Sequence, residues 1–387
     1  MSVDTTAQEL SLGVMGRSLK ENERRLALHP RQVDRIPADL RSRIFLEYGY
    51  GSEFGVSADQ LAPYVAGFLS REDLVARCDV ILQPKPVLSD IVQLRDGQVL
   101  WGWPHCVQDE ELTQVAIDHG LTLIAFEAMN HWNRDGSFDL HVFHRNNELA
   151  GYCSVMQALQ IAGLNGSYGR PMRAVVIGFG ATARGAISSL AALGVHQIDV
   201  LTHREVAAVA SPMHSARLFH FDDQTAHRLS HVDGPDGEVP LAAFLAQHDV
   251  IVNCVLQNPD SPHVFLDDAD LATLAPGTVV VDVSCDEGMG FSWARPTTFE
   301  EPTFTVGDHI LYYAVDHSPS YLWDAATWEI SEALLPFLRP VMEGTAAWED
   351  DPTLRRAIEI RSGVVQNPAI LSFQGRAAQP PHALCAT

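Results

Sequence analysis

The sequence contains no long apolar run and little positive charge. No stretch approaches the roughly 20 consecutive apolar residues that a membrane-spanning helix needs, so no membrane anchor is expected. The segment Met1–Glu9 is polar and acidic, unlike a secretory signal or a transit peptide, and we expect a cytoplasmic protein. Lysine and arginine total 26 against 49 aspartates and glutamates. The net charge of −23 makes nucleic acid an unlikely partner.

Cysteine pairs and lysines are also scarce. None of the six cysteines stands in a C-x-x-C pair or at zinc-ligand spacing, so free thiols in a reducing compartment and no metal site are expected. Cys106 and Cys285 are interpreted as packing residues. The only lysines are Lys20 and Lys85. Because the pKa of an amine can be tuned and that of a guanidinium cannot, Lys85 becomes a candidate for proton transfer, whereas Lys20 lies in a polar loop.

Short apolar strands alternate with helical segments along the chain, which predicts an α/β protein. Its 387 residues favour about two domains. We expect two Rossmann-like lobes with the active site in the cleft between them. The expected domains are a substrate domain, a dinucleotide-binding domain and C-terminal helices that return to the first domain, over residues 1–147, 148–317 and 318–387. Two of those C-terminal helices are predicted near 325–338 and 352–360.

A glycine-rich turn follows the strand expected over 173–177. Gly178 permits the tight turn, and Gly180 lets backbone approach a pyrophosphate. Ala181 comes directly before Thr182, where the next helix is expected to begin with its N-terminus facing the phosphates, and the small Ala183 allows close packing. This arrangement predicts a dinucleotide site, the alternative being a glycine-rich turn in another α/β protein.

The strand after this turn ends without the acid that usually binds the ribose 2′-hydroxyl of NAD. Thr202 occupies that place, and His203 and Arg204 follow. Arg204 could pair with a 2′-phosphate, so NADP(H) is favoured and NAD(H) remains possible. The alternative is that Arg204 is a solvated loop residue. Val255, which ends the next expected strand, completes the predicted cofactor-binding set.

Four further segments place charged or polar residues just beyond expected strands, where α/β sheets bind ligands. They are Glu-Arg-Arg-Leu-Ala-Leu-His-Pro over 23–30, Gln-Pro-Lys-Pro over 83–86, Gly-Trp-Pro-His-Cys over 102–106, and Val-Asp-Val-Ser-Cys-Asp over 281–286. In this order, and with the glycine turn, they resemble the alanine dehydrogenase, transhydrogenase and saccharopine dehydrogenase superfamily. The doubled arginine and the Gly-Trp-Pro-His string resemble carboxyethylornithine synthase. The string Val-Asp-His-Ser-Pro-Ser over 315–320 resembles the lysine-forming saccharopine dehydrogenases.

The resemblance implies roles for the charged residues of the first lobe. Arg25, with Arg24 beside it, would bind a substrate carboxylate, unless Arg25 forms a surface ion pair with Glu21 or Glu23. Lys85 and His105 would transfer protons, because burial and mutual repulsion can bring such groups toward neutral pKa values. The alternative for Lys85 is an exposed loop lysine. Trp101 and Trp103 would wall the site, or pack as core.

Two acids of the later segments complete the candidate set. Asp286 would lie near the nicotinamide and ribose or bind the substrate amine, and a helix N-cap is an equal alternative. Asp316 would contact the substrate amine or form the hinge.

These assignments predict an opine-type oxidoreductase that reductively couples a 2-oxo acid to an amino acid. The first alternative is reductive amination of a 2-oxo acid by ammonia, as in alanine dehydrogenase. The second is a nucleotide-binding protein without catalysis. The expected partners are a small 2-oxo acid and an amino acid, and a homo-oligomer is possible.

Overall fold

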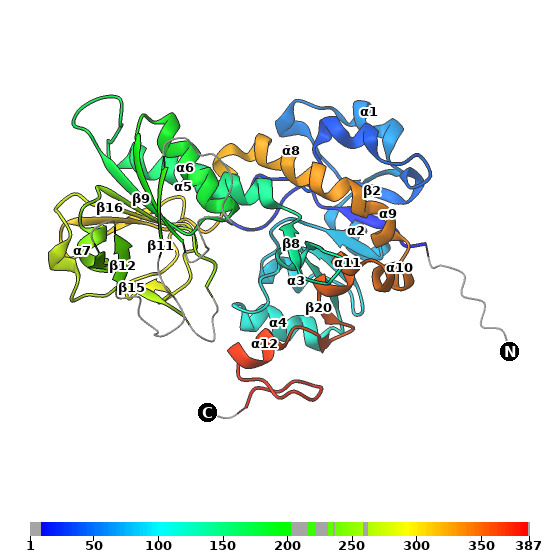
Figure 1. The fold of residues 1–387 in the computed structure, drawn as a ribbon. Helices are drawn as coiled ribbons and strands as arrows, with labels where there is room; N and C mark the ends of the chain where they lie inside the picture. Colours follow the sequence, from blue (N-terminus) through cyan, green and yellow to red (C-terminus); the bar gives the residue numbers. More distant parts are fainter. Residues whose placement is uncertain (1–8, 203–215, 221–230, 235–236, 258–261, 386–387) are drawn as a thin grey trace. The chain divides into compact units, whose positions relative to one another are not determined.

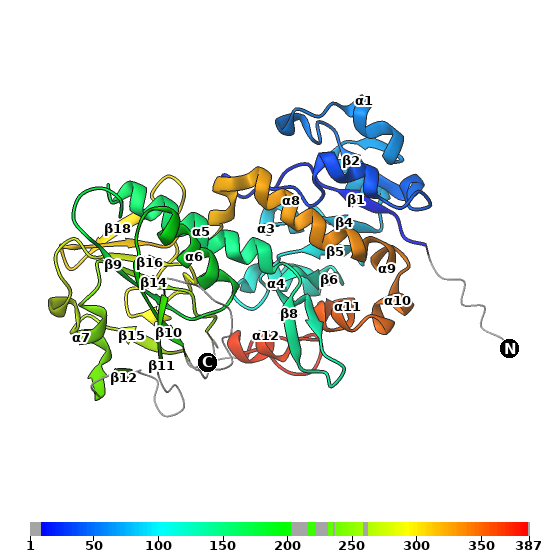
Figure 2. The same ribbon diagram turned by 45° about the horizontal axis from the view of Figure 1, so that its top comes forward.

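The computed structural model describes residues 9–202, 216–220, 231–234, 237–257 and 262–385. The chain divides into two compact units (Figures 1 and 2). Unit 1 combines the chain up to Phe143 with the chain from Trp323 onward, and unit 2 is His144–Leu322. The sequence-based boundaries, 147/148 and 317/318, differ from these by four and five residues. In the described part of the chain, no helix is long and apolar enough to cross a membrane.

Unit 1 is built on an eight-stranded sheet in the order β21-β20-β6-β5-β4-β1-β2-β3. The strands from β1 to β6 pair in parallel, whereas β20 runs antiparallel to β6 and to β21. Their bounds are Leu12–Val14 (β1), Ile44–Glu47 (β2), Gly67–Leu69 (β3), Val80–Leu82 (β4), Val99–Gly102 (β5), Thr122–Ala125 (β6), Ile358–Arg361 (β20) and Val364–Val365 (β21). Two further strands, β7 (Asn130–Trp132) and β8 (Phe138–His141), form a separate antiparallel hairpin.

Helices and short 3-10 turns surround this sheet. The α-helices are Ala58–Leu61 (α1), Arg71–Arg77 (α2), Leu88–Ile91 (α3), Glu110–Asp118 (α4), Trp323–Leu334 (α8), Leu338–Met342 (α9), Thr345–Asp350 (α10), Pro352–Ala357 (α11) and Pro368–Phe373 (α12). The expected helix over 352–360 is therefore wrong in its last part. Ile358 and Ile360 are buried in a strand between β21 and β6, because pairing and burial in the sheet outweigh local helical preference.

Unit 2 contains a nine-stranded sheet in the order β13-β12-β11-β10-β9-β14-β16-β19-β18. Its central strands β10, β9, β14, β16 and β19 are parallel. The strand bounds are Arg173–Ile177 (β9), Gln197–Thr202 (β10), Ala216–His220 (β11), His231–Gly234 (β12), Gly237–Pro240 (β13), Val250–Asn253 (β14), Val279–Asp282 (β16), Thr303–Val306 (β18) and Ile310–Tyr313 (β19). Val264–Leu266 (β15) and Gly290–Phe291 (β17) form a separate pair.

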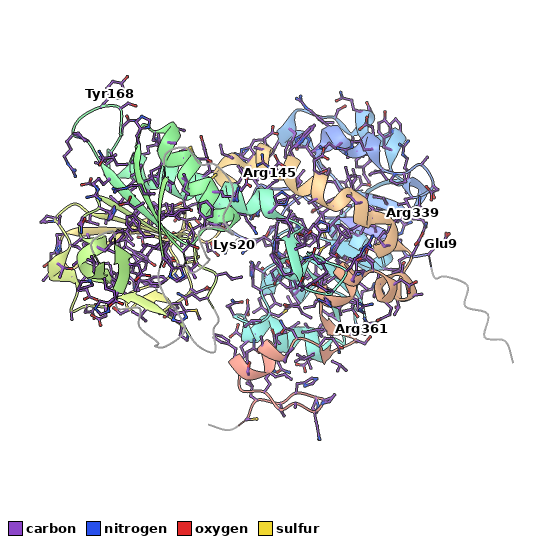
Figure 3. The ribbon with its side chains drawn as sticks, viewed as in Figure 1. Glu9, Lys20, Arg145, Tyr168, Arg339 and Arg361 are labelled. Atoms are coloured by element: carbon purple, nitrogen blue, oxygen red, sulfur yellow. The ribbon has the colours of Figure 1, made fainter. Side chains whose placement is uncertain are left out.

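The helices of unit 2 are His144–Ile161 (α5), Ala181–Ala192 (α6) and Leu241–Leu245 (α7). Helices α5 and α6 pack against each other at very short range. A Cβ atom added to Gly185 of α6 would lie 1.7 Å from the carbonyl oxygen of Glu148 in α5. Figure 3 shows exposed Tyr168 on the loop between α5 and β9, and β9 is the first strand of the nine-stranded sheet in chain order. The α/β prediction with parallel sheets and two domains is confirmed.

Candidate active site

The two predicted proton-transfer residues of unit 1 meet at the carboxyl ends of adjacent strands. Lys85 follows β4 and His105 follows β5, and these strands pair in parallel. The Nζ atom of Lys85 lies 2.8 Å from Nε2 of His105. Gly102 is needed for this approach, because a Cβ atom there would lie 2.0 Å from the carbonyl oxygen of Gln83. The pair is thus built into the sheet, and Lys85 is half-buried rather than fully exposed.

His105 is held in an unusual backbone conformation by a third residue. Its φ angle is +50°, in the left-handed region that non-glycine residues rarely adopt. The main-chain N–H of His105 donates to Oε1 of Glu127 at 2.7 Å, and its Nδ1 atom lies 3.9 Å from the same oxygen. Residues held in this region cluster at functional sites, so the strain supports a specific placement of the imidazole.

Glu127 was missed by the sequence analysis, although it follows β6 as Lys85 follows β4. A quarter of its side chain is exposed, but the Oε2 atom is buried and has no hydrogen-bond partner among the described residues. Burial and then the negative charge of Glu359 raise the pKa of Glu127 to about 8, while Lys85 acts in the opposite direction. A carboxyl group that can hold a proton near neutrality therefore stands beside the Lys85–His105 pair.

Two tryptophans and an arginine lie near this pair. Trp101 is fully buried and packs edge-on against Phe126, so it belongs to the core. Trp103 is also buried, but the guanidinium of Arg25 lies 5.5 Å from its ring centre. The Trp103 side chain therefore links the core to the Arg25 position.

Arg25 is 4% exposed and pairs with Glu23. Its Nε atom donates to Glu23 Oε1 at 2.8 Å, and Nη2 donates to Oε2 at 2.5 Å. The alternative of a surface ion pair with Glu21 or Glu23 is therefore wrong in its location, because the pair with Glu23 is buried. If Nε and Nη2 of Arg25 were to bind a substrate carboxylate with two hydrogen bonds, Glu23 would first have to be displaced.

Arg24 has a different environment. Its side chain is about half exposed, donates from Nε to Glu53 at 2.9 Å and lies over the Trp323 ring at 4.2 Å. Arg24 lines a cavity of about 440 Å³ at the carboxyl ends of β1, β2 and β3. Charged residues of both signs line this cavity, namely Arg17, Arg24, Arg71, Glu23, Glu47 and Glu53.

The cavity wall is tied to the segment that carries Lys85. The hydroxyl of Ser18, next to Arg17, donates to the Lys85 carbonyl. Arg71 donates to Asp90 Oδ1 at 2.6 Å, and Asp90 Oδ2 accepts from the Val87 main-chain N–H at 3.0 Å. The cavity and the Lys85–His105 pair therefore occupy neighbouring positions along one edge of the same sheet.

In unit 2 the predicted dinucleotide turn joins β9 to α6. Gly178 has a φ angle of +99°, and a Cβ atom there would lie 3.1 Å from the Cys254 carbonyl oxygen. Gly180 caps the N-terminus of α6, and a Cβ atom there would meet no other atom within 4 Å. Backbone N–H groups at a helix start beside such open space fit a pyrophosphate.

The other predicted cofactor residues surround this turn. Ala181 and Thr182 form the first turn of α6, and Ala183 is buried. Thr202 ends β10 and is buried, and Val255 lies just beyond β14, next to the Gly178 position. His203 and Arg204 lie outside the described residues. The residues that are described fit a nicotinamide dinucleotide.

The acids predicted from the later segments lie beyond β16 and β19. Asp286 is half-buried, and burial raises its pKa. No helix follows it, since the chain turns into β17, so the N-cap alternative is wrong. Asp316 contacts Nδ1 of His317 at 2.5 Å. A further acid, Asp282, is fully buried and accepts hydrogen bonds from Asn253 and Tyr312.

No cluster of three or more potential metal-binding side chains occurs within the described ranges. Unit 1 contains the Lys85–His105 pair, and unit 2 contains the glycine-rich turn with the geometry of a dinucleotide site.

Comparison with known proteins assigns the chain to a family. Residues 15–146 match the family described as Alanine dehydrogenase/PNT, N-terminal domain, and residues 149–368 match Alanine dehydrogenase/PNT, C-terminal domain. The chain belongs to the alanine dehydrogenase/PNT family. The superfamily resemblance and the prediction of a nicotinamide-dependent oxidoreductase are thereby confirmed. The narrower likeness to opine-forming enzymes stays a prediction.

Individual relatives are similar over almost their whole length. An alanine dehydrogenase of Mycobacterium tuberculosis is 26% identical over 377 residues, which cover 92% of this chain and 95% of the relative. A solved L-alanine dehydrogenase superposes with a TM-score of 0.72 at 19% identity, covering 94% of this chain and 99% of the other. The transhydrogenase of Sinorhizobium meliloti gives a TM-score of 0.66 at 21% identity, covering 92% and 99%. The two structures show a shared fold.

Proposed function

We propose that this protein is a nicotinamide-dependent amino-acid dehydrogenase, which reductively aminates a small 2-oxo acid with ammonia and can run in reverse. The observation that carries the proposal is the 2.8 Å contact between Lys85 and His105 at neighbouring strand ends. The similarity to alanine dehydrogenases over 92% of the chain supports the same reaction class. This replaces the opine-type reaction as the leading hypothesis.

Amination of a 2-oxo acid needs protons at defined atoms. The carbonyl oxygen must gain protons before it leaves as water, and the amine must lose protons as the C–N bond forms. Nζ of Lys85 and Nε2 of His105 are within hydrogen-bond distance, so one can polarise the carbonyl while the other accepts or returns a proton. Bound cofactor supplies the hydride. Buried Trp103 and the buried Arg25–Glu23 pair keep water away from one side of this region.

Cofactor choice within this function is a separate proposal. Thr202, a neutral residue, ends β10 where NAD-specific sites usually present an acid. We propose that NADP(H) is accepted at least as well as NAD(H). Titration of the protein with each reduced cofactor, followed by nicotinamide fluorescence, gives the two dissociation constants. A dissociation constant clearly lower for NADH than for NADPH would contradict this proposal.

The cavity beside the Lys85 segment favours opine formation as a second candidate function. Its volume of about 440 Å³ is within the range of small-molecule pockets, and its mixed charges match a zwitterionic amino acid. Ammonia requires no such pocket. If an amino acid bound there, its amine in place of ammonia would condense with the 2-oxo acid.

One set of assays separates the candidates. NADH and NADPH oxidation is followed with pyruvate or 2-oxoglutarate, together with ammonia or with one of several amino acids. Turnover with ammonia alone supports the dehydrogenase and contradicts the opine reaction. Turnover that requires an amino acid supports the opine reaction and contradicts the dehydrogenase.

A pair of arginine variants tests the cavity directly. If the opine reaction occurs, Arg24→Ala should raise the KM for the amino acid about tenfold or more, because one guanidinium of the cavity is lost. Arg339→Ala is the matched control, because Arg339, which lies on α9 (Figure 3), forms an exposed ion pair with Asp39. Equal KM values for the two variants would count against the cavity as a substrate site.

A further inference from the structure

Unit 2 contains a cavity at the opposite end of its sheet from the glycine-rich turn. The cavity has a volume of about 440 Å³ and lies at the amino ends of β9, β10 and β11. No acidic side chain is among the described residues that line it, although the chain carries a net charge of −23. Positive side chains gathered against such a background indicate an anionic ligand. The lining residues are Arg173, His196, Gln197, Ile198 and Arg217.

The two arginines of this cavity are held in place by one buried carboxylate, that of Asp199 on β10, which is 1% exposed. Nε and Nη2 of Arg217 donate to its two oxygens at 2.8 and 2.9 Å, and Nη2 of Arg173 donates to Oδ2 at 3.2 Å. The side chains of Arg217 and Arg173 are 63% and 34% exposed, and no acceptor among the described residues faces Nη1 of either. Each guanidinium is therefore oriented from behind and keeps N–H groups for a ligand.

A third cation lies behind the arginines. The side chain of His248 is completely buried, with Nε2 2.9 Å from Asp199 Oδ2 and Nδ1 3.0 Å from the Phe244 carbonyl oxygen. Burial by itself raises the pKa of Asp199, but hydrogen bonds from His248 and Arg217 lower it below its ordinary value, so the carboxylate is ionised. A carboxylate and a carbonyl oxygen can only accept. Both ring nitrogens therefore donate, and His248 is an imidazolium.

The charges of this group do not balance. The imidazolium and the two guanidinium groups share the single carboxylate of Asp199, which leaves two positive charges among them. A neighbouring acid, Asp249, accepts from the main-chain N–H of Arg173 at 2.8 Å, but its other oxygen pairs with the Arg170 guanidinium at 2.5 Å. A phosphate group carries a charge of about −1.5 to −2 at neutral pH and has three strong acceptor oxygens. It matches both the charge and the N–H groups of the arginines.

We propose that this cavity binds a small phosphate-bearing anion between the guanidinium groups of Arg173 and Arg217. The site is separate from the dinucleotide turn, because Arg173 begins β9 and Gly178 follows the last residue of that strand, about 16 Å away. The volume of about 440 Å³ is in the range of pockets for organic ligands, which favours a phosphate carried on an organic molecule. The proposal does not depend on which reaction the protein catalyses.

Calorimetric titration tests the binding, in the presence of excess NADH so that the dinucleotide turn is occupied. The probes are glucose 6-phosphate, inorganic phosphate and, as the uncharged control, glucose, all at the same ionic strength. A dissociation constant of about 1 mM or lower is expected for at least one phosphate probe, with no binding of glucose. Tighter binding of glucose 6-phosphate identifies an organic phosphate as the ligand, whereas equal or tighter binding of inorganic phosphate identifies the free anion. If neither phosphate probe binds, the proposal is wrong.

Arginine variants locate the binding. Arg217→Gln should weaken binding of the better phosphate probe about tenfold or more, because charge-assisted hydrogen bonds are lost. Arg170→Gln is the matched control, since the Arg170 side chain is also 63% exposed but is not among the residues that line the cavity. Arg217→Lys keeps the charge and loses the paired N–H groups, so it should weaken binding by a smaller factor, and it replaces Arg217→Gln if that variant does not fold. Equal dissociation constants for the Arg217 variant and Arg170→Gln would overturn the proposal.

Discussion

The contact between α5 and α6 allows a quantitative prediction about Gly185. The residue lies in the middle of α6, where alanine is normally preferred to glycine by about 1 kcal/mol. An added Cβ atom would, however, lie 1.7 Å from the Glu148 carbonyl oxygen and 2.6 Å from its carbon. Both are backbone atoms, which no rotamer change can move. We therefore expect Gly185→Ala to force the two helices apart.

The size of the effect follows from these opposing contributions. Overpacking of a well-packed interface costs about 3 kcal/mol when backbone has to shift, and the gain in helix preference offsets about 1 kcal/mol. The net loss in the free energy of unfolding of unit 2 is about 2 kcal/mol. For a unit of this size, that loss lowers the melting temperature by about 4–8 °C.

Gly180→Ala is the matched comparison, since it is the same change five residues earlier. Space for a Cβ atom is open there, so the melting temperature should fall by much less, because only a modest N-cap preference is lost. The methyl group instead occupies the space proposed for the pyrophosphate, and the cofactor dissociation constant should rise about tenfold or more. Thermal unfolding by circular dichroism and cofactor titration give both quantities. Equal stability of Gly185→Ala and the unaltered protein would refute the packing argument, and unchanged cofactor affinity of Gly180→Ala would refute the phosphate assignment.

Three further predictions concern charged groups. Lys85→Arg and His105→Ala should each reduce kcat by about 100-fold or more with cofactor affinity retained, and wild-type rates in both variants would contradict a proton-transfer role for this pair. Asp282 is fully buried, and burial raises its pKa to about 6, so its stabilising protonated form is lost as the pH rises through 6. Asp282→Asn should therefore flatten the change in unfolding free energy between about pH 4 and pH 7, by about 3 kcal/mol, in denaturant titrations. Asp199 is buried and accepts hydrogen bonds from buried His248 and from the largely exposed Arg217. Asp199→Asn should lower the free energy of unfolding by about 2 kcal/mol in the same titrations, and an unchanged value would contradict a stabilising role for these bonds.

The parts of the site that are local in sequence could be predicted from it. The turn from Gly178 to Ala183 joins β9 to α6. Helix α6 begins at Ala181, one residue earlier than the start at Thr182 that the sequence predicts. Lys85 and His105 each follow a short apolar strand, and parallel pairing of those strands brings them together. Patterns of this kind are readable because a strand, its turn and the next helix are contiguous.

The parts that depend on distant pairing could not be predicted. Glu359 follows a helix and was expected to continue it, but Ile358 and Ile360 are buried against β6, more than 230 residues earlier in the chain. The burial of the Arg25–Glu23 pair was equally hidden, because Glu23 could be named from the sequence as a possible partner only for an ion pair at the surface. Burial and sheet edges are set by tertiary packing, which no local pattern contains.

The strand β20 also has a consequence for the order in which the protein is made. Unit 2 is complete once Leu322 has been synthesised, whereas the sheet of unit 1 still lacks β20 and β21 at that time. Domains generally fold as units during synthesis, so the nucleotide-binding fold can form on the ribosome before the sheet that carries Lys85 and His105 is finished. Glu359 joins Glu127 only when nearly the whole chain has emerged. A nascent or prematurely terminated chain is therefore expected to bind dinucleotide without being able to use it, and the ability to move protons is acquired last.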